Sequence, residues 1–231
     1  MYAMILAGGQ GERLRPLTDT VPKPMVEVVG KPILWYQIQW LLKYGVSHVV
    51  MLVGYKWEAI QDYFGDGSSI GLNIQYLVEK MPLGRGGAFR NGLSQLPTSE
   101  NRVIATNGDV MTTQDIGPIL QGHIANHCVA TTMLVPLISP FGIVEADNNG
   151  LVTAFREKPR LSQWINGGVY ILDREIERML PEVGDHEDST FPSLALEGKL
   201  WSFKSDSFWK SVDNFKDLRE AEEAVERGLY R

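Results

Sequence analysis

Apolar and polar positions in the first 135 residues switch repeatedly between a short continuous pattern and a helical one. Ala3–Ala7 is a continuous apolar run that ends at Gly8 and Gly9, as is typical of a buried strand leading into a loop. After Pro32, apolar residues recur every three to four positions until Gly45, which predicts a helix. The same criteria predict strands over Val49–Val53, Leu72–Val78, Val103–Thr106 and Val129–Val135, and helices over Trp57–Phe64 and Ile116–Ile124.

This alternation of strands and helices indicates the fold class. Strands separated by helices form right-handed βαβ units, and a series of such units builds a parallel sheet covered on both faces. We therefore expect an α/β protein with a three-layer, Rossmann-like, mixed but mostly parallel sheet. In folds of this kind ligands bind outside the carboxyl ends of the strands.

The second half of the chain is less regular. Two apolar runs flank Asp147–Gly150, a strong hairpin signal, and Ile165–Leu172 reads as a further strand. A final helix follows over Phe215–Val225, capped by Asp213 or Asn214. A chain of 231 residues, 44% of them hydrophobic, can bury one full core, so we expect a single domain over residues 1–231.

Composition narrows the classes of partner. A net charge of −6 gives no broad basic surface for a nucleic acid. No apolar stretch approaches the length of about 18 residues that a membrane helix needs, and the start does not resemble a signal peptide. The single cysteine, Cys128, excludes an intramolecular disulfide framework and fits a reducing compartment. We expect a cytoplasmic protein without nucleic-acid or membrane partners.

The loop after the first predicted strand carries the strongest chemical signal. Gly8, Gly9 and Gly11 let backbone N–H groups approach an anion closely, and Arg13 and Lys23 add mobile cationic donors. This combination suits a triphosphate. The loop is neither a P-loop nor the G-x-G-x-x-G fingerprint of dinucleotide-binding proteins, and glycines alone are equally consistent with a tight turn.

The motif Leu6-Ala7-Gly8-Gly9-x-Gly11-x-Arg13-Leu14-x-Pro16-Leu17-Thr18, followed by Pro22-Lys23-Pro24-Met25, resembles the signature of the sugar-1-phosphate nucleotidyltransferases, also called NDP-sugar pyrophosphorylases. Later members of the series follow in order: Asn107-Gly108-Asp109, Phe141-Gly142-Ile143-Val144, Glu157-Lys158-Pro159, Ile165-Asn166-Gly167-Gly168-Val169-Tyr170 and Phe208-Trp209. The resemblance covers about residues 3 to 225. It implies a nucleotidyltransferase fold similar to that of GT-A enzymes.

The resemblance also implies an enzymatic activity, nucleotidyl transfer to a sugar 1-phosphate, that serves carbohydrate biosynthesis. An oxygen of a sugar 1-phosphate attacks the α-phosphate of an NTP in line, with Mg²⁺, and pyrophosphate leaves. Residues 1–135 would mainly bind the nucleotide and residues 136–231 mainly the sugar phosphate. Since the sugar phosphate is already ionised, positioning and charge neutralisation suffice, and none of the four histidines is required.

Roles for single residues follow from the resemblance. The catalytic residues would be Arg13, Lys23 and Asp109, and Mg²⁺ would be held by Asp109 and Asp213. The nucleotide-binding residues would be Leu6, Ala7, Gly8, Gly9, Gly11, Arg13, Gly87 and Asn107. The sugar-phosphate-binding residues would be Gly142, Glu157, Lys158 and Asn166, with Trp209 near the sugar.

Structural alternatives stand beside these roles. Surface ion pairs are the alternative for Arg13 and Lys23, and for the pair Glu157 and Lys158. A helix cap is the alternative for Asp213, and the bracing of a turn is the alternative for Asn166.

Other functions remain open at this point. A non-catalytic homologue that binds sugar nucleotides would be expected to lack Arg13, Lys23 or a metal carboxylate, and all are retained. A GT-A glycosyltransferase would be expected to carry Asp-x-Asp where this chain has Asp109-Val110-Met111. Some motifs resemble glucose-1-phosphate cytidylyltransferases, and others resemble mannose- and heptose-1-phosphate guanylyltransferases or thymidylyl- and uridylyltransferases. The nucleotide and sugar are therefore undecided, and tryptophan-rich faces allow a homo-oligomer.

Overall fold

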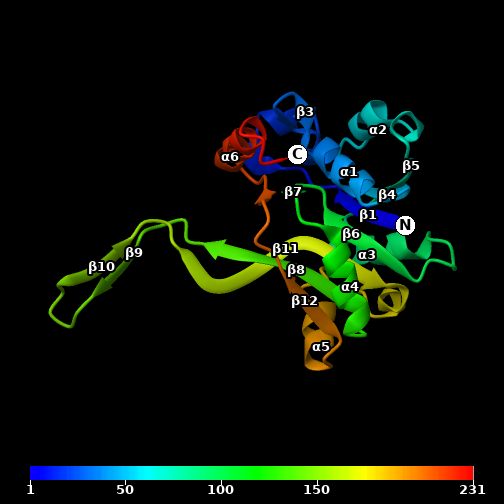
Figure 1. The fold of residues 1–231 in the computed structure, drawn as a ribbon. Coiled ribbons are helices and arrows are strands. Elements are labelled where there is room, and N and C mark those ends of the chain that lie inside the picture. The colour runs from blue at the N-terminus through cyan, green and yellow to red at the C-terminus, as the bar shows by residue number, and fades with distance from the viewer. Residues whose placement is uncertain (231) are drawn as a thin grey trace.

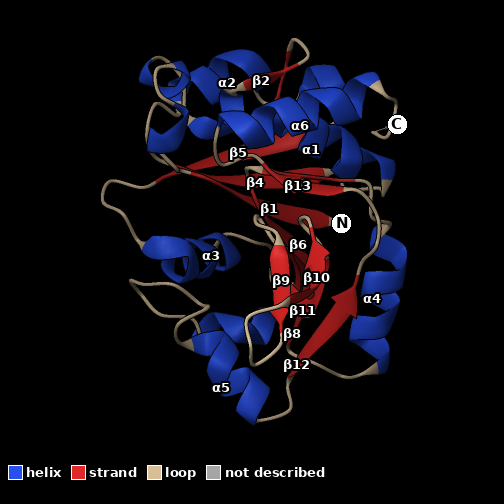
Figure 2. Ribbon diagram, turned by 90° about the vertical axis from the view of Figure 1, so that its left-hand side faces the viewer, coloured by secondary structure: helices blue, strands red, loops and turns tan. Residues whose placement is uncertain are grey.

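A seven-stranded sheet forms the centre of the computed structural model, which describes residues 1–230 (Figures 1 and 2). The strand order is β12-β8-β11-β6-β1-β4-β5. The strands are β1 (Tyr2–Ala7), β4 (His48–Val53), β5 (Asn73–Val78), β6 (Arg102–Asn107), β8 (Ala130–Ile138), β11 (Arg160–Asp173) and β12 (Leu200–Lys204). Only β11 runs antiparallel to its neighbours β6 and β8. The expected mixed, mostly parallel sheet is confirmed.

Helices cover both faces of this sheet, as Figure 2 shows. The helices are α1 (Ile33–Lys43), α2 (Glu58–Phe64), α3 (Gly84–Ser94), α4 (Ile116–Ala125), α5 (Thr190–Leu196) and α6 (Phe215–Glu226). Successive side chains of β1 point to opposite faces, so Ala3 and Ile5 pack with α1, α2 and α4, and Met4 packs with α3 and α5. The expected three-layer arrangement is therefore confirmed.

Smaller elements extend this core. Two short antiparallel ladders pair β2 (Glu27–Val28) with β3 (Lys31–Pro32), and β7 (Val110–Thr112) with β13 (Trp209–Ser211). The predicted hairpin is confirmed as β9 (Ile143–Ala146) and β10 (Val152–Arg156), and it projects from the body of the molecule in Figure 1. Short 3₁₀ helices cover Glu12–Leu14, Leu17–Asp19, Lys23–Met25, Ser68–Ile70 and Arg174–Arg178.

The start of α6 decides between the two caps predicted for this helix. The Asn214 side chain accepts hydrogen bonds from the backbone N–H groups of Lys216 and Asp217, at 2.9 and 3.1 Å. The alternative in which Asp213 is the cap is wrong, because its carboxylate points to other partners. Over residues 1–230, no helix is both long enough and apolar enough to cross a membrane.

Candidate active site

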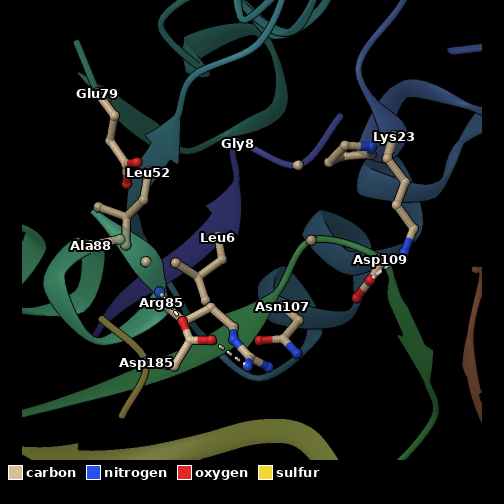
Figure 3. Close-up of a pocket in the computed structure, with 14 residues that line it drawn as sticks. Leu6, Gly8, Lys23, Leu52, Glu79, Arg85, Ala88, Asn107, Asp109 and Asp185 are labelled. Carbon is tan, nitrogen blue, oxygen red and sulfur yellow. Dashed lines mark hydrogen bonds and ion pairs between the residues drawn. The ribbon is translucent and has the colours of Figure 1, made fainter. Parts of the chain in front are cut away.

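A pocket of about 320 Å³ opens where β1 and β6 end, which is where a sheet of this kind binds ligands (Figure 3). Figure 3 shows Lys23 and Asp109 on one side and Leu52 and Glu79 on the other. The pocket is lined by Leu6, Gly8, Gly9, Lys23, Pro24, Leu52, Glu79, Gly84, Arg85, Ala88, Asn107, Gly108, Asp109 and Asp185. Four of the predicted nucleotide-binding residues are therefore on its wall: Leu6, Gly8, Gly9 and Asn107.

The glycine-rich loop folds back onto the turn that holds Lys23. Gly11 has a left-handed backbone with φ of 69°, and a Cβ added to it would lie 2.8 Å from the Cβ of Lys23. The hydroxyl of Thr18 donates to the Gly11 carbonyl at 2.9 Å. The backbone N–H of Lys23 donates to the Gly9 carbonyl at 3.4 Å. Gly11 thus leaves room for the side chain of Lys23 and does not itself line the pocket.

Arg13, Lys23, Asp109 and Asp213 form one ionic cluster at the end of the pocket. The ammonium of Lys23 lies 2.6 Å from Oδ2 of Asp109 and 2.6 Å from Oδ1 of Asp213. The guanidinium of Arg13 lies 2.9 Å from the same Oδ1 of Asp213. The four residues predicted to be catalytic or to hold the metal are therefore joined by direct ion pairs, although they come from three distant parts of the chain.

The ladder between β7 and β13 brings the two carboxylates together. Ser211 pairs with Val110, and the backbone N–H of Val212 donates to the carbonyl of Asp109 at 3.0 Å. The hydroxyl of Ser211 also donates to Oδ2 of Asp213 at 2.9 Å. This backbone pairing places Asp213 beside Asp109.

Burial and charge act in opposite directions on the ionisable groups of the cluster. Burial by itself would lower the pKa of Lys23, but the carboxylates of Asp109 and Asp213 outweigh it and raise that pKa above its ordinary value. Burial would likewise raise the pKa of Asp213, but the hydrogen bond and charge of Lys23 hold it below its usual range. The cluster therefore favours the charged forms of both residues.

Asn166 is not on the wall of the pocket, and its side chain bonds within the protein. Its Oδ1 accepts from the Thr132 hydroxyl and from the N–H of Gly168, both at 3.0 Å, and its Nδ2 donates to the hydroxyl of Tyr170 at 2.8 Å. A Cβ on Gly168 would lie 2.8 Å from Nδ2 of Asn107. Asn166 therefore braces the turn that faces Asn107, as the structural alternative for this residue expected.

The other three residues predicted to bind sugar phosphate lie at the base of the hairpin. A Cβ on Gly142 would lie 2.9 Å from Oε2 of Glu157, and the ammonium of Lys158 lies 3.6 Å from Oε1 of the same carboxylate. Lys158 lines a second cavity of about 540 Å³ together with Trp209. The structure groups these residues with each other and not on the wall of the pocket in Figure 3.

The glycines at the start of α3 pack against the segment 182–187. The N–H groups of Gly86 and Gly87 donate to the carbonyl of Gly184 at 2.9 and 3.2 Å. A Cβ on Gly87 would lie 2.5 Å from the carbonyl oxygen of Glu182. Gly87 therefore makes room for this segment. Ala7, buried within β1, is also absent from the pocket wall.

The sequence analysis gave no role to several residues of the pocket wall, among them Leu52, Glu79 and Asp185. Glu79 directly follows a predicted strand that ends at Val78, so its position at a carboxyl end was a usable signal. Asp185 is held by Arg85, which donates to it from both its backbone N–H and its guanidinium at 2.8 Å. No spacing in the sequence indicates this contact, because it joins residues 100 positions apart.

The fold and the site together define an α/β protein with a glycine-rich loop and a lysine–aspartate cluster at the strand ends. The chain belongs to the Nucleotidyl transferase family, whose sequence model matches residues 2–228. The resemblance stated from the motifs is therefore confirmed at the level of the family.

Curated relatives agree with this assignment. A mannose-1-phosphate guanylyltransferase of Mycobacterium tuberculosis is 34% identical over 98% of this chain and 65% of its own length. A D-glycero-alpha-D-manno-heptose 1-phosphate guanylyltransferase of Aneurinibacillus thermoaerophilus is also 34% identical, over 98% of this chain and 99% of its own length. A UTP–glucose-1-phosphate uridylyltransferase of Synechocystis is 30% identical over 96% of this chain and 62% of its own length. The chain thus spans less than two thirds of the first and third of these relatives.

A solved structure shows the same fold. HddC from Yersinia pseudotuberculosis superposes with a TM-score of 0.78 at 25% identity, covering 97% of this chain and 99% of its own. A second structure of HddC, complexed with GMP-PN, gives a TM-score of 0.76.

Proposed function

We propose that this protein transfers the guanylyl group of GTP to a manno-configured hexose or heptose 1-phosphate and releases pyrophosphate. The observation that carries the proposal is the cluster of Arg13, Lys23, Asp109 and Asp213 beside the glycine-rich loop. An oxygen of the sugar phosphate would form a bond to the α-phosphorus, and the bond to the β-phosphate bridge would break. The reaction brings two anions together, so fixed positive charge at this point lowers its barrier.

Each cation has a task that its position supports. Lys23 lies between the glycine loop and the carboxylates, where its ammonium can reach a phosphate on the pocket floor. Arg13 is 71% exposed at its side chain, so it is free to turn onto the leaving pyrophosphate. Three rotatable donors on the lysine and a planar fork on the arginine suit these two tasks.

The donor set of the cluster fits Mg²⁺. Oδ1 of Asp109 is buried and has no hydrogen-bond partner, so one hard oxygen is left for a cation. Within residues 1–230 no group of three or more histidine, cysteine or acidic side chains could hold a metal ion. Two carboxylates are nevertheless enough for Mg²⁺, which takes its remaining ligands from phosphates and water. We propose that Asp109 and Asp213 hold this ion, which when bound would neutralise charge on the phosphates.

The choice of GTP rests on two lines of support. Two of the relatives are named as guanylyltransferases, one of them matched over nearly its whole length, and the uridylyltransferase is less similar. Glu79 is a carboxylate on the pocket wall, across from Lys23 in Figure 3. An ionised carboxylate only accepts hydrogen bonds, and guanine offers two adjacent donors, N1–H and the 2-amino group.

The test is pyrophosphate release by the purified protein with Mg²⁺, four NTPs and a set of hexose and heptose 1-phosphates. We expect release with GTP and a manno-configured acceptor, at a higher kcat/KM than with UTP, CTP or dTTP. The Glu79→Gln variant should lose about 10- to 100-fold in kcat/KM for GTP, the usual weight of one good bidentate contact. Release with no pair would contradict the activity, and preference for another NTP would contradict the choice of base.

A further inference from the structure

The ammonium of Lys23 occupies the position between the two proposed metal carboxylates. It lies 2.6 Å from an oxygen of Asp109 and 2.6 Å from an oxygen of Asp213, and its side chain is only 12% exposed. Figure 3 shows the side chain of Lys23 extended toward Asp109. Lys23 is thus the counter-ion of this carboxylate pair.

The oxygens of Asp213 are already in use in this arrangement. Oδ1 accepts from Lys23 and from Arg13, and Oδ2 accepts from the hydroxyl of Ser211. A carboxylate oxygen has about two lone-pair sites, so Oδ1 has none left for a metal. A cation that binds both aspartates must first displace Lys23 or Arg13.

The charges of the cluster also indicate that a metal ion must displace Lys23 or Arg13. Two carboxylates face two cationic side chains, so the cluster of Arg13, Lys23, Asp109 and Asp213 is neutral overall. A divalent cation that entered while both side chains stayed in place would meet their repulsion in a partly buried site. A triphosphate brings negative charge to the same end of the pocket and can draw the two side chains away from the carboxylates.

We propose that Lys23 holds the place of the metal until a triphosphate arrives, so that metal binding depends on nucleotide binding. This inference rests on the proposed function, because it takes Mg²⁺ and an NTP as the ligands. Lys23 would then have two positions, on the carboxylates in the free protein and on the phosphates in the complex. By linkage, the metal must strengthen triphosphate binding by the same factor.

The test measures Mn²⁺ binding to the purified protein without nucleotide, from the electron paramagnetic resonance of the free ion. We expect weak binding to the wild type and binding tighter by about tenfold or more in Lys23→Met, which is within the usual range of coupling between sites. The gain should vanish in the double variant Lys23→Met, Asp109→Asn. Wild-type Mn²⁺ affinity in Lys23→Met, or a gain that survives the Asp109 change, would overturn the proposal.

Matched variants show whether a gain in Mn²⁺ affinity comes from removing Lys23 from between the two carboxylates or only from losing a positive charge. Arg13→Met removes the same charge beside Asp213 but not the contact with Asp109, so its gain should be smaller. Lys210 on β13 bridges two acidic residues of α6, Asp217 and Glu220, in a similar way. Lys210→Met should leave the Mn²⁺ affinity unchanged. An equal gain in either variant would contradict the inference.

Two further controls keep the test independent of other failures. Circular dichroism checks the fold of each variant, and Lys23→Gln replaces Lys23→Met if the latter does not fold. Mn²⁺ binding is read without turnover, so it can fail while pyrophosphate release succeeds, and the reverse. The two proposals are therefore contradicted by different results.

Discussion

Gly11 shows at the scale of one residue how the loop determines the site. Its backbone is left-handed, and the space beside its Cα is filled by the side chains of Lys23 and Thr18. A side chain at this position would both strain the backbone and press on the lysine of the ionic cluster. Gly9, in the same loop, has no atom within 4 Å of the place where a Cβ would lie. The two glycines therefore have different physical reasons to be there.

The variant Gly11→Ala tests this difference. We expect it to lower the free energy of unfolding by about 1 to 2 kcal/mol, the cost of placing alanine in the left-handed region, with the contact to Lys23 adding to it. Gly9→Ala should stay within about 0.5 kcal/mol of the wild type, as is usual for an exposed, uncrowded position. Urea unfolding measures both values. Equal losses in the two variants would refute the account of the loop.

Two neighbouring residues at the start of α6, Asp213 and Asn214, have different roles. Asn214 satisfies the first N–H groups of the helix, and Asp213 contacts Lys23 and Arg13. The sequence alone left both as caps, since aspartate and asparagine cap helices equally well.

We predict a clean separation of their effects. Asn214→Ala should cost about 1 kcal/mol of stability, the usual value of a lost N-cap, and keep pyrophosphate release. Asp213→Asn should lower turnover by about 100-fold or more, the scale for losing one fixed electrostatic group at a reacting centre. Chemical unfolding and a pyrophosphate assay on both variants provide the check. Loss of turnover in Asn214→Ala alone would reverse the assignment.

The segment around His186 packs against the start of α3 and carries a titratable group into the core. His186 is 1% exposed, and its ring contacts Phe89, Tyr170 and Phe191. Neither ring nitrogen makes a hydrogen bond, and Nδ1 lies 3.2 Å from Oε2 of Glu187. Burial is the main cause that lowers the pKa of His186 to about 4 from an ordinary value of 6.5. Folding therefore keeps this histidine neutral where the unfolded chain would protonate it.

Stability should accordingly fall as the pH is lowered. Between pH 6.5 and about 4, His186 is protonated in the unfolded chain but stays neutral in the folded protein. The free energy of unfolding therefore decreases by on the order of 3 kcal/mol as the pH falls through this window. His186→Leu should flatten this part of the profile. The exposed His127, with a left-handed backbone that asparagine tolerates, supplies the control His127→Asn. A profile unchanged by His186→Leu would contradict the argument.

Sequence patterns predicted the elements better than their contacts. The apolar runs and helical spacing gave the strands β1, β4, β5, β6 and β8 and the helices α1 and α4, because burial on the sheet imposes those periods. The strand β13, with three residues, is too short to show a period. The contact of Lys23 with Asp213 spans 190 residues, so the family resemblance indicated Asp213 and no local pattern did.

At the scale of the whole molecule, the glycine loop and the ionic cluster lie together at the carboxyl ends of β1 and β6. β1 delivers the glycine loop, β6 delivers Asn107 and Asp109, and the ladder of β7 with β13 adds Asp213 from near the end of the chain. The division of labour between residues 1–135 and 136–231, the cytoplasmic location and assembly into a homo-oligomer stay predictions. The binding of sugar phosphate at Gly142, Glu157, Lys158 and Asn166 also stays a prediction; the first three of these residues gather at the hairpin base.

The most direct measurement follows the α-phosphate of GTP through a single turnover with Mg²⁺ and mannose 1-phosphate or a manno-heptose 1-phosphate. With label at the α-phosphate, the account predicts that radioactivity appears in the GDP-sugar. With label at the γ-phosphate, it predicts radioactivity in pyrophosphate. Both transfers should be lost in Asp109→Asn. Label that stays in GTP with every acceptor, or that appears only in GDP and inorganic phosphate, would contradict nucleotidyl transfer.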